Sequence, residues 1–367
     1  MLRELSRRDL IRLSSLAAGV SFVRCATSSF PIPIGRRSPV IVDRSRVIRT
    51  VVGLRPYRPS GFVLEAEPLG DKLLVHNYGH GGCGVTLSWG TAQLAVEHAL
   101  QRSNRQAAVI GCGAVGLATA RLLQDHGFYV TIYAKALPPD TTSNMAGALW
   151  LPVTLVDRNR RTPRFDQQLE QATRFAWRYF QTLVGERYGV HWVETDCIED
   201  RNDPELPHEV ERIADLVPFN PLEPNPYPTR FARRLHTMLI EPPTYLRAVL
   251  EDFRLTGGNV VVREFADRAS LSQLDEPIIV NCTGLGAHDL VGDAELQPIK
   301  GQLTVLLPQP EIDYATVGPG DLYMFSRRDG VILGGTHERG VWSLDVNAAE
   351  AERVFQGHRQ LFGALRR

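Results

Sequence analysis

AAVIGCGAVGLATARLLQDHGFYVTIYAK, residues 107–135, is the stretch that predicts the fold of this chain. An apolar strand leads into Gly111, Gly113 and Gly116, which have G-x-G-x-x-G spacing, and an amphipathic helix and a second apolar strand follow. Gly111 permits a tight turn, Gly113 lets the backbone approach a pyrophosphate, and Gly116 lets the helix pack against the strand. The positive end of the helix dipole then faces the phosphates. This context predicts a dinucleotide-binding Rossmann-type unit; the alternative is a tight turn that packs without a ligand.

The end of the second strand departs from the usual pattern. Such a strand usually ends in Asp or Glu, which binds a ribose hydroxyl about 20 residues past the glycines. Here the strand ends in Tyr133, Ala134 and Lys135. A cation at Lys135 could meet a phosphate on the ribose, as in NADP sites, or the ribose could be held in another way. At this point FAD and NADP both remain open.

Composition bounds the class of protein. The chain has 367 residues, of which 43% are hydrophobic and 22% charged, which is typical of a globular protein with room for two domains. Its 41 Lys and Arg balance 41 Asp and Glu, and no basic stripe with interleaved aromatics is present, so we expect no nucleic-acid partner. The five cysteines form no C-x-x-C and there is no H-E-x-x-H, so we expect neither a metal site nor a disulfide framework.

The N-terminus resembles a twin-arginine export signal. Residues 6–12 read SRRDLIR, and the apolar run over 13–23 is too short for an ordinary transmembrane helix. We expect the twin-arginine export machinery to be a partner and the protein to be periplasmic or otherwise extracytoplasmic. If the segment is an ordinary basic amphipathic helix instead, the protein is cytoplasmic. The Ser, Pro and Arg that follow predict a linker up to residue 45.

A second glycine-rich loop precedes the first. Residues 77–86 read NYGHGGCGVT, with four glycines in six residues, and the apolar spacing from there to residue 100 predicts a helix. Four glycines cannot pack a core, but they allow backbone to come very close to a ligand. A strand over 277–280 ends at NCTG, residues 281–284, at the kind of carboxyl edge where open α/β sheets bind ligands.

The remaining pattern alternates parallel-sheet units with antiparallel blocks. Helices are predicted over 162–183, 242–253 and 348–361, and a hairpin over 322–335 turns at Asp329-Gly330. We therefore predict an α/β fold, with a Rossmann-type cofactor domain plus a substrate domain built on a mixed or antiparallel sheet. The expected boundaries are 1–45 for signal and linker, 70–150 with 235–300 for the cofactor domain, 46–69 with 151–234 and 301–347 for the substrate domain, and 348–367 for a terminal helix.

Several motifs together resemble the D-amino-acid oxidase family of FAD enzymes. They are GLRP at 53–56, HNYGHGGCGVTLSWG at 76–90, VIGCGAVGLATA at 109–120, IYAKALPPDTTSNMAGALW at 132–150, VNCTG at 280–284 and LYMF at 322–325. The HNYGHGG run is highly specific, because no generic structural requirement produces it. The resemblance covers the chain from about residue 51 to residue 342 and implies FAD as the cofactor.

The order of these motifs is unusual. In the family the G-x-G-x-x-G unit opens the chain and GLRP and HNYGHGG close it, whereas here GLRP and HNYGHGG come first. This order indicates a circular permutation, which is tolerated when the joined termini lie near each other on the surface. It predicts that the terminal helix from Ala348 packs near the strand that begins at Val47.

The resemblance implies roles for individual residues. Arg55 matches the arginine that grips the substrate carboxylate, Tyr323 a tyrosine that binds the same carboxylate, and Gly82 a glycine whose carbonyl accepts from the substrate amine. Without a ligand, Arg55 would be a turn arginine and Tyr323 an aromatic in a sheet. Pro319 stands where the family has a second substrate tyrosine, and Lys135 where it has the acidic ribose ligand. The implied cofactor contacts are Gly81, Gly82, Gly84, Val85 and Thr86 beside the flavin ring, Gly111, Gly113, Ala114, Val115 and Gly116 at the pyrophosphate, Thr141, Thr142 and Ser143 near the phosphates, Ala148 and Leu149 at the ring, and Phe265 at the adenine.

The implied reaction needs no side-chain base. A D-amino acid with a neutral amine transfers a hydride from Cα to flavin N5, the imino acid hydrolyses to the 2-oxo acid and ammonia, and oxygen is reduced to hydrogen peroxide. The alternatives are a related flavoprotein that acts on glycine, D-aspartate or a secondary amine or uses another acceptor, an NADP-binding sensor or dehydrogenase, and an inactive exported scaffold. A homodimer is a candidate assembly.

Overall fold

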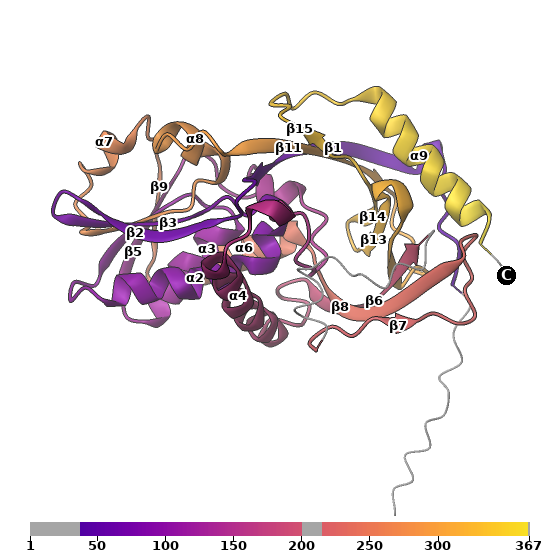
Figure 1. The fold of residues 1–367 in the computed structure, drawn as a ribbon, viewed down its shortest axis with the longest axis horizontal. Coiled ribbons are helices and arrows are strands. Elements are labelled where there is room, and N and C mark those ends of the chain that lie inside the picture. The colour runs from indigo at the N-terminus through magenta and orange to yellow at the C-terminus, as the bar shows by residue number, and fades with distance from the viewer. Residues whose placement is uncertain (1–36, 200–214, 366–367) are drawn as a thin grey trace, which may run out of the picture. The chain divides into compact units, whose positions relative to one another are not determined.

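Two β-sheets organise the chain in this computed structural model, which describes residues 37–199 and 215–365 (Figure 1). The predicted twin-arginine signal lies outside the described residues, so export stays a prediction. Among the described helices, none is both long enough and apolar enough to cross a membrane. The described residues from Ser38 onward belong to one compact unit.

The first sheet confirms the Rossmann-type unit expected from the glycine motif. Its strand order is β2-β3-β10-β4-β5-β9, and all neighbours are parallel except β2, which is antiparallel to β3. The strands are β2 Val63–Leu69, β3 Lys72–Tyr78, β4 Gln106–Ile110, β5 Tyr129–Ala134, β9 Asn259–Val262 and β10 Ile278–Asn281. In the register, Asn281 of β10 lies opposite both His76 of β3 and Ile110 of β4. Both glycine-rich loops therefore leave the sheet at its carboxyl edge, with β10 between them.

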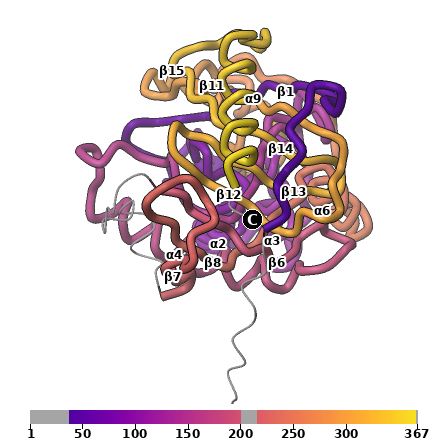
Figure 2. The backbone as a smooth tube through the Cα atoms, turned by 90° about the vertical axis from the view of Figure 1, so that its right-hand side faces the viewer, coloured from indigo at the N-terminus to yellow at the C-terminus, as the bar shows by residue number. Residues whose placement is uncertain are grey.

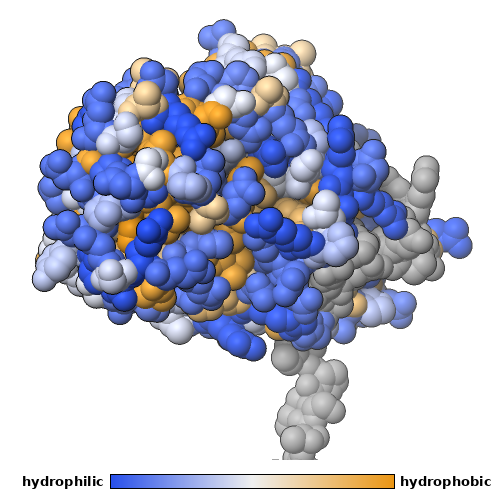
Figure 3. Space-filling view, turned by 60° about the vertical axis from the view of Figure 1, so that its left-hand side comes forward, coloured by the Kyte–Doolittle hydropathy of each residue, from blue (hydrophilic) through white to orange (hydrophobic). Residues whose placement is uncertain are grey.

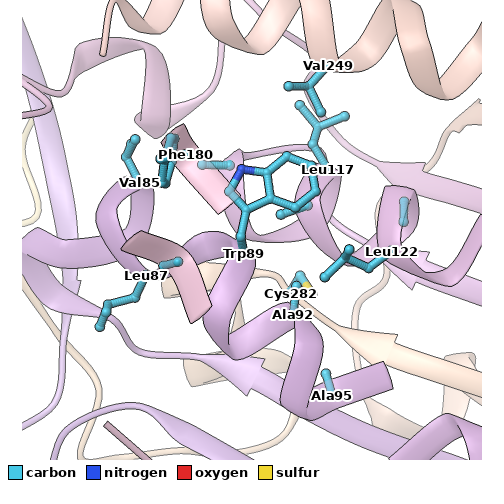
Figure 4. Packing of buried hydrophobic residues seen from close by; sticks show 14 of the residues in the cluster. Val85, Leu87, Trp89, Ala92, Ala95, Leu117, Leu122, Phe180, Val249 and Cys282 are labelled. Atoms are coloured by element: carbon cyan, nitrogen blue, oxygen red, sulfur yellow. The ribbon is translucent and has the colours of Figure 1, made fainter. Parts of the chain in front are cut away.

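Helices cover both faces of this sheet (Figure 1). One face carries α2 Gly84–Leu100, α3 Ala114–Asp125, α4 Pro163–Thr182 and α6 Pro242–Leu255, and the other carries the short α7 Arg268–Leu271 and α8 Ala287–Leu290. Trp89 of α2 is buried in the apolar cluster on this face, and Figure 4 shows it between Leu117 of α3 and Phe180 of α4. A Cβ on Gly90 would lie 1.8 Å from the Ala172 carbonyl oxygen, so glycine is what lets α2 and α4 pack this closely.

The second sheet has nine strands and is mostly antiparallel. Its order is β1-β11-β14-β13-β12-β6-β8-β7, with β15 beside β11, and only the β12–β6 pair is parallel. The strands are β1 Val47–Tyr57, β6 Val190–Glu199, β7 Asn220–Pro221, β8 Phe231–Ile240, β11 Gln297–Leu306, β12 Tyr314–Val317, β13 Tyr323–Arg327, β14 Gly330–Gly334 and β15 Glu338–Arg339. The predicted hairpin is confirmed as β13 and β14. Short 3-10 turns fill several connections: η1 Arg44–Arg46, η2 Gly81–Cys83, η3 Thr142–Met145, η4 Arg158–Arg160, η5 Gly284–Gly286 and η6 Pro319–Asp321.

The terminal helix α9, Ala348–Gly363, lies against the segment that leads into β1 (Figures 1 and 2). The guanidinium of Arg44 pairs with Glu352 and lies 4.7 Å from the centroid of the Phe355 ring. Val40 is buried in one apolar cluster with Val354 and other side chains of α9. The proximity of these two segments, predicted from the motif order, is therefore confirmed.

The predicted boundaries need three corrections. Residues 38–45 are packed rather than a passive linker, because the Gln309 side chain bonds both backbone groups of Ile41 and the Tyr314 hydroxyl donates to the Ser38 carbonyl. β2, expected in the substrate domain, belongs to the Rossmann sheet because it pairs with β3 along its whole length. β8 and β11, expected at the two ends of the cofactor domain's second segment, belong to the other sheet, where β8 pairs with β6 and β11 with β1.

The surface drawn in Figure 3 is mostly hydrophilic, with hydrophobic residues visible in small areas. The most exposed large apolar side chains are Tyr129, Leu255 and Val262, which come from β5, α6 and β9. Exposed apolar side chains scattered in this way are ordinary for a globular protein.

Candidate functional site

A cavity of about 1010 Å³ brings the sequence motifs together. Its walls come from the carboxyl edge of the Rossmann sheet and from β1, β11 and β13 of the second sheet. His80 and Cys112, one from each glycine-rich loop, both line it. The predicted site residues that line the cavity are Arg55, Gly81, Gly82, Gly84, Val85, Thr86, Gly111, Gly113, Ala114, Val115, Thr141, Thr142, Ser143, Ala148, Leu149, Phe265 and Tyr323.

Gly116 is the predicted residue that does not line the cavity. A Cβ at this position would lie 2.1 Å from the Gly111 carbonyl oxygen. Gly116 therefore has the packing role expected from its place in the motif, holding α3 against the turn, and its inclusion among the cofactor contacts is corrected.

The glycine turn and the hydroxyl loop form one cradle. Gly111 has φ +114°, and a Cβ there would lie 2.5 Å from the Cys282 carbonyl oxygen, so this position requires glycine. A Cβ on Gly113 would lie 3.0 Å from the Ser143 hydroxyl oxygen, which accepts a 3.0 Å hydrogen bond from the Ala114 amide. The N-terminus of α3, the bare backbone of Gly113 and a hydroxyl therefore meet at one point, which suits a phosphate group.

Two backbone corners with positive φ also line the cavity. On one side Gly81 has φ +54°, and its Cβ would lie 2.4 Å from the Thr154 carbonyl oxygen, which also accepts a 3.0 Å hydrogen bond from the Gly82 amide. On the other side Ala148 has φ +62°, a strained value for a residue with a side chain, and its carbonyl accepts from the Ile240 amide at 3.0 Å. A backbone hydrogen bond fixes each corner, and the backbone of both corners lines the cavity.

Arg55 and Tyr323 meet at the end of the cavity beside the second sheet. One guanidinium nitrogen donates to the Thr336 carbonyl at 3.1 Å and another to the Tyr323 hydroxyl at 3.5 Å. The guanidinium lies over Gly301 of β11, where a Cβ would be 2.6 Å from Nη2. The Tyr323 ring likewise lies over Gly334 of β14, where a Cβ would be 2.0 Å from the ring. Two strand glycines thus make room for a cation and a hydroxyl side by side.

Reasoning from the sequence missed Gly301, Gly334, Asp321 and His337. The glycines carried a usable signal, because an isolated glycine in a strand often marks a close approach of another group. Asp321 has φ +62° and lies 3.6 Å from the ring of His337, and both line the cavity. Burial, and then the positive charge of Arg55, lowers the pKa of His337. Arg55 therefore stands beside a histidine whose charged form is disfavoured.

Burial favours the neutral forms of a histidine and two cysteines in the wall. Burial lowers the pKa of His80 to about 3, and its Nε2 lies 3.0 Å from the Thr91 hydroxyl. Burial likewise raises the pKa of Cys112 and of Cys282 to about 12, so neither thiol forms a thiolate near neutral pH. In the described ranges, no cluster of His, Cys, Asp and Glu is placed to hold a metal ion.

The residues present fit a flavin dinucleotide. The cradle, the two backbone corners and Arg55 all line this one cavity. Asn77 lines it with an Oδ1 that is buried and has no partner, while its Nδ2 donates to Thr119. A buried acceptor without a partner is costly and suggests a ligand donor. Lys135 and Phe265, which are expected near the adenosine half, line the same cavity.

Comparisons with known proteins agree with this geometry. The family model for FAD dependent oxidoreductases (DAO) matches residues 24–98 and 106–367. A D-amino-acid oxidase of Rubrobacter xylanophilus is 30% identical over 68% of this chain and 75% of its own, and the human D-aspartate oxidase is 28% identical over 67% and 73%. Among solved structures, a glycine oxidase from Bacillus cereus has a TM-score of 0.53 at 14% identity, over 71% of this chain and 79% of its own. That likeness concerns the fold alone.

Proposed function

The chain belongs to the DAO family of FAD-dependent oxidoreductases, and from this premise we propose that it oxidatively deaminates a D-amino acid. The overall reaction is D-amino acid plus O₂ plus water giving 2-oxo acid, ammonia and hydrogen peroxide. The observation that carries the proposal is the Arg55–Tyr323 pair at the end of a cavity whose other walls fit FAD. Relatives named D-amino-acid oxidase support the substrate class.

Each protein group has a binding task. FAD, when bound, supplies the electron acceptor that takes the hydride from Cα and passes the electrons to oxygen. Arg55 can hold the carboxylate through two parallel charge-assisted bonds, and the Tyr323 hydroxyl can donate a further one. The carbonyl of Gly82 can accept from the amine. The Gly82 amide donates to the Thr154 carbonyl, and this bond fixes the position of the loop. With carboxylate and amine fixed, only one enantiomer directs its Cα–H at the flavin, and the chemistry needs no side-chain base.

The experiment is an assay in air with pairs of D- and L-amino acids. We expect 2-oxo acid and peroxide in equal amounts from D-enantiomers and none from L-enantiomers, with catalase removing the peroxide as a control. The panel includes glycine, D-aspartate and a secondary amine, because relatives carry the names D-aspartate oxidase and glycine oxidase. Turnover confined to those compounds would favour the alternative, and turnover of L-enantiomers would contradict the proposal. Dimerisation stays a prediction.

We also propose that the chain is a circular permutant of the family's usual order. The contact of α9 with residues 40–44 supports this, because in the family's usual order the chain would continue from α9 into the segment that leads to β1. The two matched segments of the family model leave residues 99–105 between them, and that connection from α2 to β4 contains exposed residues where a chain end is tolerated. A reordered chain that begins at Asn104 and joins Leu365 to Ser38 through a short linker is expected to fold and bind FAD with an unchanged absorbance spectrum. A chain reopened inside β6 is the unfolded control. A reordered chain as insoluble as that control would contradict the permutation.

A further inference from the structure

The carboxylate missing from the end of β5 is present on the neighbouring strand. Lys135 follows β5 directly, and its Nζ lies 3.3 Å from Oε1 of Glu264. Glu264 comes two residues after β9, which runs parallel to β5 with Val262 opposite Ala134. Both side chains line the cavity. A cation therefore follows β5 and a carboxylate follows the neighbouring β9, at the same edge of the sheet.

We propose that Glu264 is the acceptor for the ribose hydroxyls of the cofactor's adenosine half. The inference rests on FAD binding by the family fold and is independent of the proposed substrate. It assigns the ribose contact to a strand on which the dinucleotide motif places no acidic residue.

The neighbours of Glu264 place it beside an aromatic platform. Phe265 is half-buried, meets the Tyr133 ring edge-on at 5.8 Å, and lies under the guanidinium of Arg263 at 4.6 Å. The Arg263 amide donates to the Ala134 carbonyl at 3.1 Å and ties the two strand ends together. A base stacked near Phe265 would leave its ribose next to Glu264, between β9 and the cradle at the start of α3.

The chemistry of the pair favours a ribose diol over a ribose phosphate. A carboxylate has two acceptor oxygens and can accept from both hydroxyls of a diol, whereas an ammonium group can only donate. The side chains of Lys135 and Glu264 are 69% and 70% exposed, so their ion pair contributes little and leaves the carboxylate available. A 2′-phosphate bound to Lys135 would stand beside the Glu264 carboxylate and be repelled. The pair therefore disfavours NADP and suits the unphosphorylated ribose of FAD.

The test measures nucleotide binding to the full-length apoprotein by calorimetry, with ADP and 2′-deoxy-ADP as probes. The native protein is expected to prefer ADP by about 10- to 100-fold, the range for a charge-assisted hydrogen bond. Glu264→Gln should lose most of that preference and raise the Kd for FAD by a similar factor. Lys135→Gln should keep the preference and change the Kd for FAD by less than about threefold. Glu170→Gln, which removes an exposed glutamate paired with Arg174 outside the cavity, is the matched control and should change neither value.

Two results would overturn the inference. One is a Glu264→Gln protein that keeps the full preference for ADP over 2′-deoxy-ADP. The other is a native protein that binds 2′-phospho-ADP-ribose more tightly than ADP and loses this on Lys135→Gln. Binding of FMN, which lacks the adenosine half, should be the same in all variants and reports correct folding. No substrate enters these measurements, so their outcome is separate from that of the D-amino-acid assay.

Discussion

Arg55→Ala is expected to weaken binding of the amino-acid substrate by about 2–5 kcal/mol, the scale for truncating one partner of a buried charge pair. The guanidinium sits in a space made by Gly301 and is aimed by the Thr336 carbonyl, so no neighbouring cation can take its place without rearrangement. The effect should appear in KM, or in the Kd from anaerobic titration. FAD binding should be retained, because Arg55 is not part of the phosphate cradle formed by Gly113, Ala114 and Ser143.

Arg55→Lys separates charge from geometry. Lysine keeps the charge but loses the planar fork that binds a carboxylate through two bonds, so we expect partial recovery only. Arg49→Ala is the matched control, because Arg49 lies on the same strand and pairs with Asp329 at the surface. Unchanged kinetics in both Arg55 variants would remove this residue from the site.

Gly116→Ala is expected to destabilise the protein by about 3 kcal/mol or more, at the upper end for overpacking, because the new methyl group meets backbone that cannot rotate away. Its Cβ would lie 2.1 Å from the Gly111 carbonyl oxygen and 2.9 Å from that carbonyl carbon. Either α3 moves away from the sheet or the turn deforms, and both changes disturb the phosphate cradle. Denaturant unfolding of the apoprotein measures the loss without any contribution from FAD.

Two other Gly→Ala variants serve as controls for this prediction. Gly363→Ala adds the same methyl group near the end of α9, where nothing lies within 4 Å, and should leave stability within about 0.5 kcal/mol. Gly113→Ala meets the flexible hydroxyl of Ser143 and should mainly raise the Kd for FAD. A Gly116→Ala protein as stable as the native one would show that α3 does not pack on the turn as described.

The features that could be predicted from the sequence are those set by local pattern. The β4-turn-α3-β5 unit, helices α2, α4, α6 and α9, and the β13–β14 hairpin each follow from periodicity and from glycine or proline at fixed places. The cavity residues were found because short motifs carried them. Their meeting in one cavity follows from the parallel register of β3, β10 and β4, which brings both glycine-rich loops to the same edge.

What could not be predicted depends on pairing between distant strands. Gly301 lies beneath Arg55 because β1 and β11 pair across nearly 250 residues, and no local pattern specifies that register. The membership of β2 in the Rossmann sheet was missed although its signal is local, because β2 and β3 form a hairpin that turns at Gly70 and Asp71. Residues 38–45 have the composition of a linker, yet they are ordered by Gln309, Tyr314 and α9, which come at the other end of the chain.

The central claim is that one cavity holds an electron acceptor against its backbone corners and an acid group on Arg55. The most direct test is anaerobic mixing of the FAD-bound protein with D- and L-enantiomers of a panel of amino acids, following flavin absorbance. We predict that at least one D-enantiomer bleaches the flavin completely, that its L-enantiomer does not, and that Arg55→Ala requires a much higher concentration for the same bleaching. Flavin that stays oxidised with every D-amino acid in the panel would contradict the account.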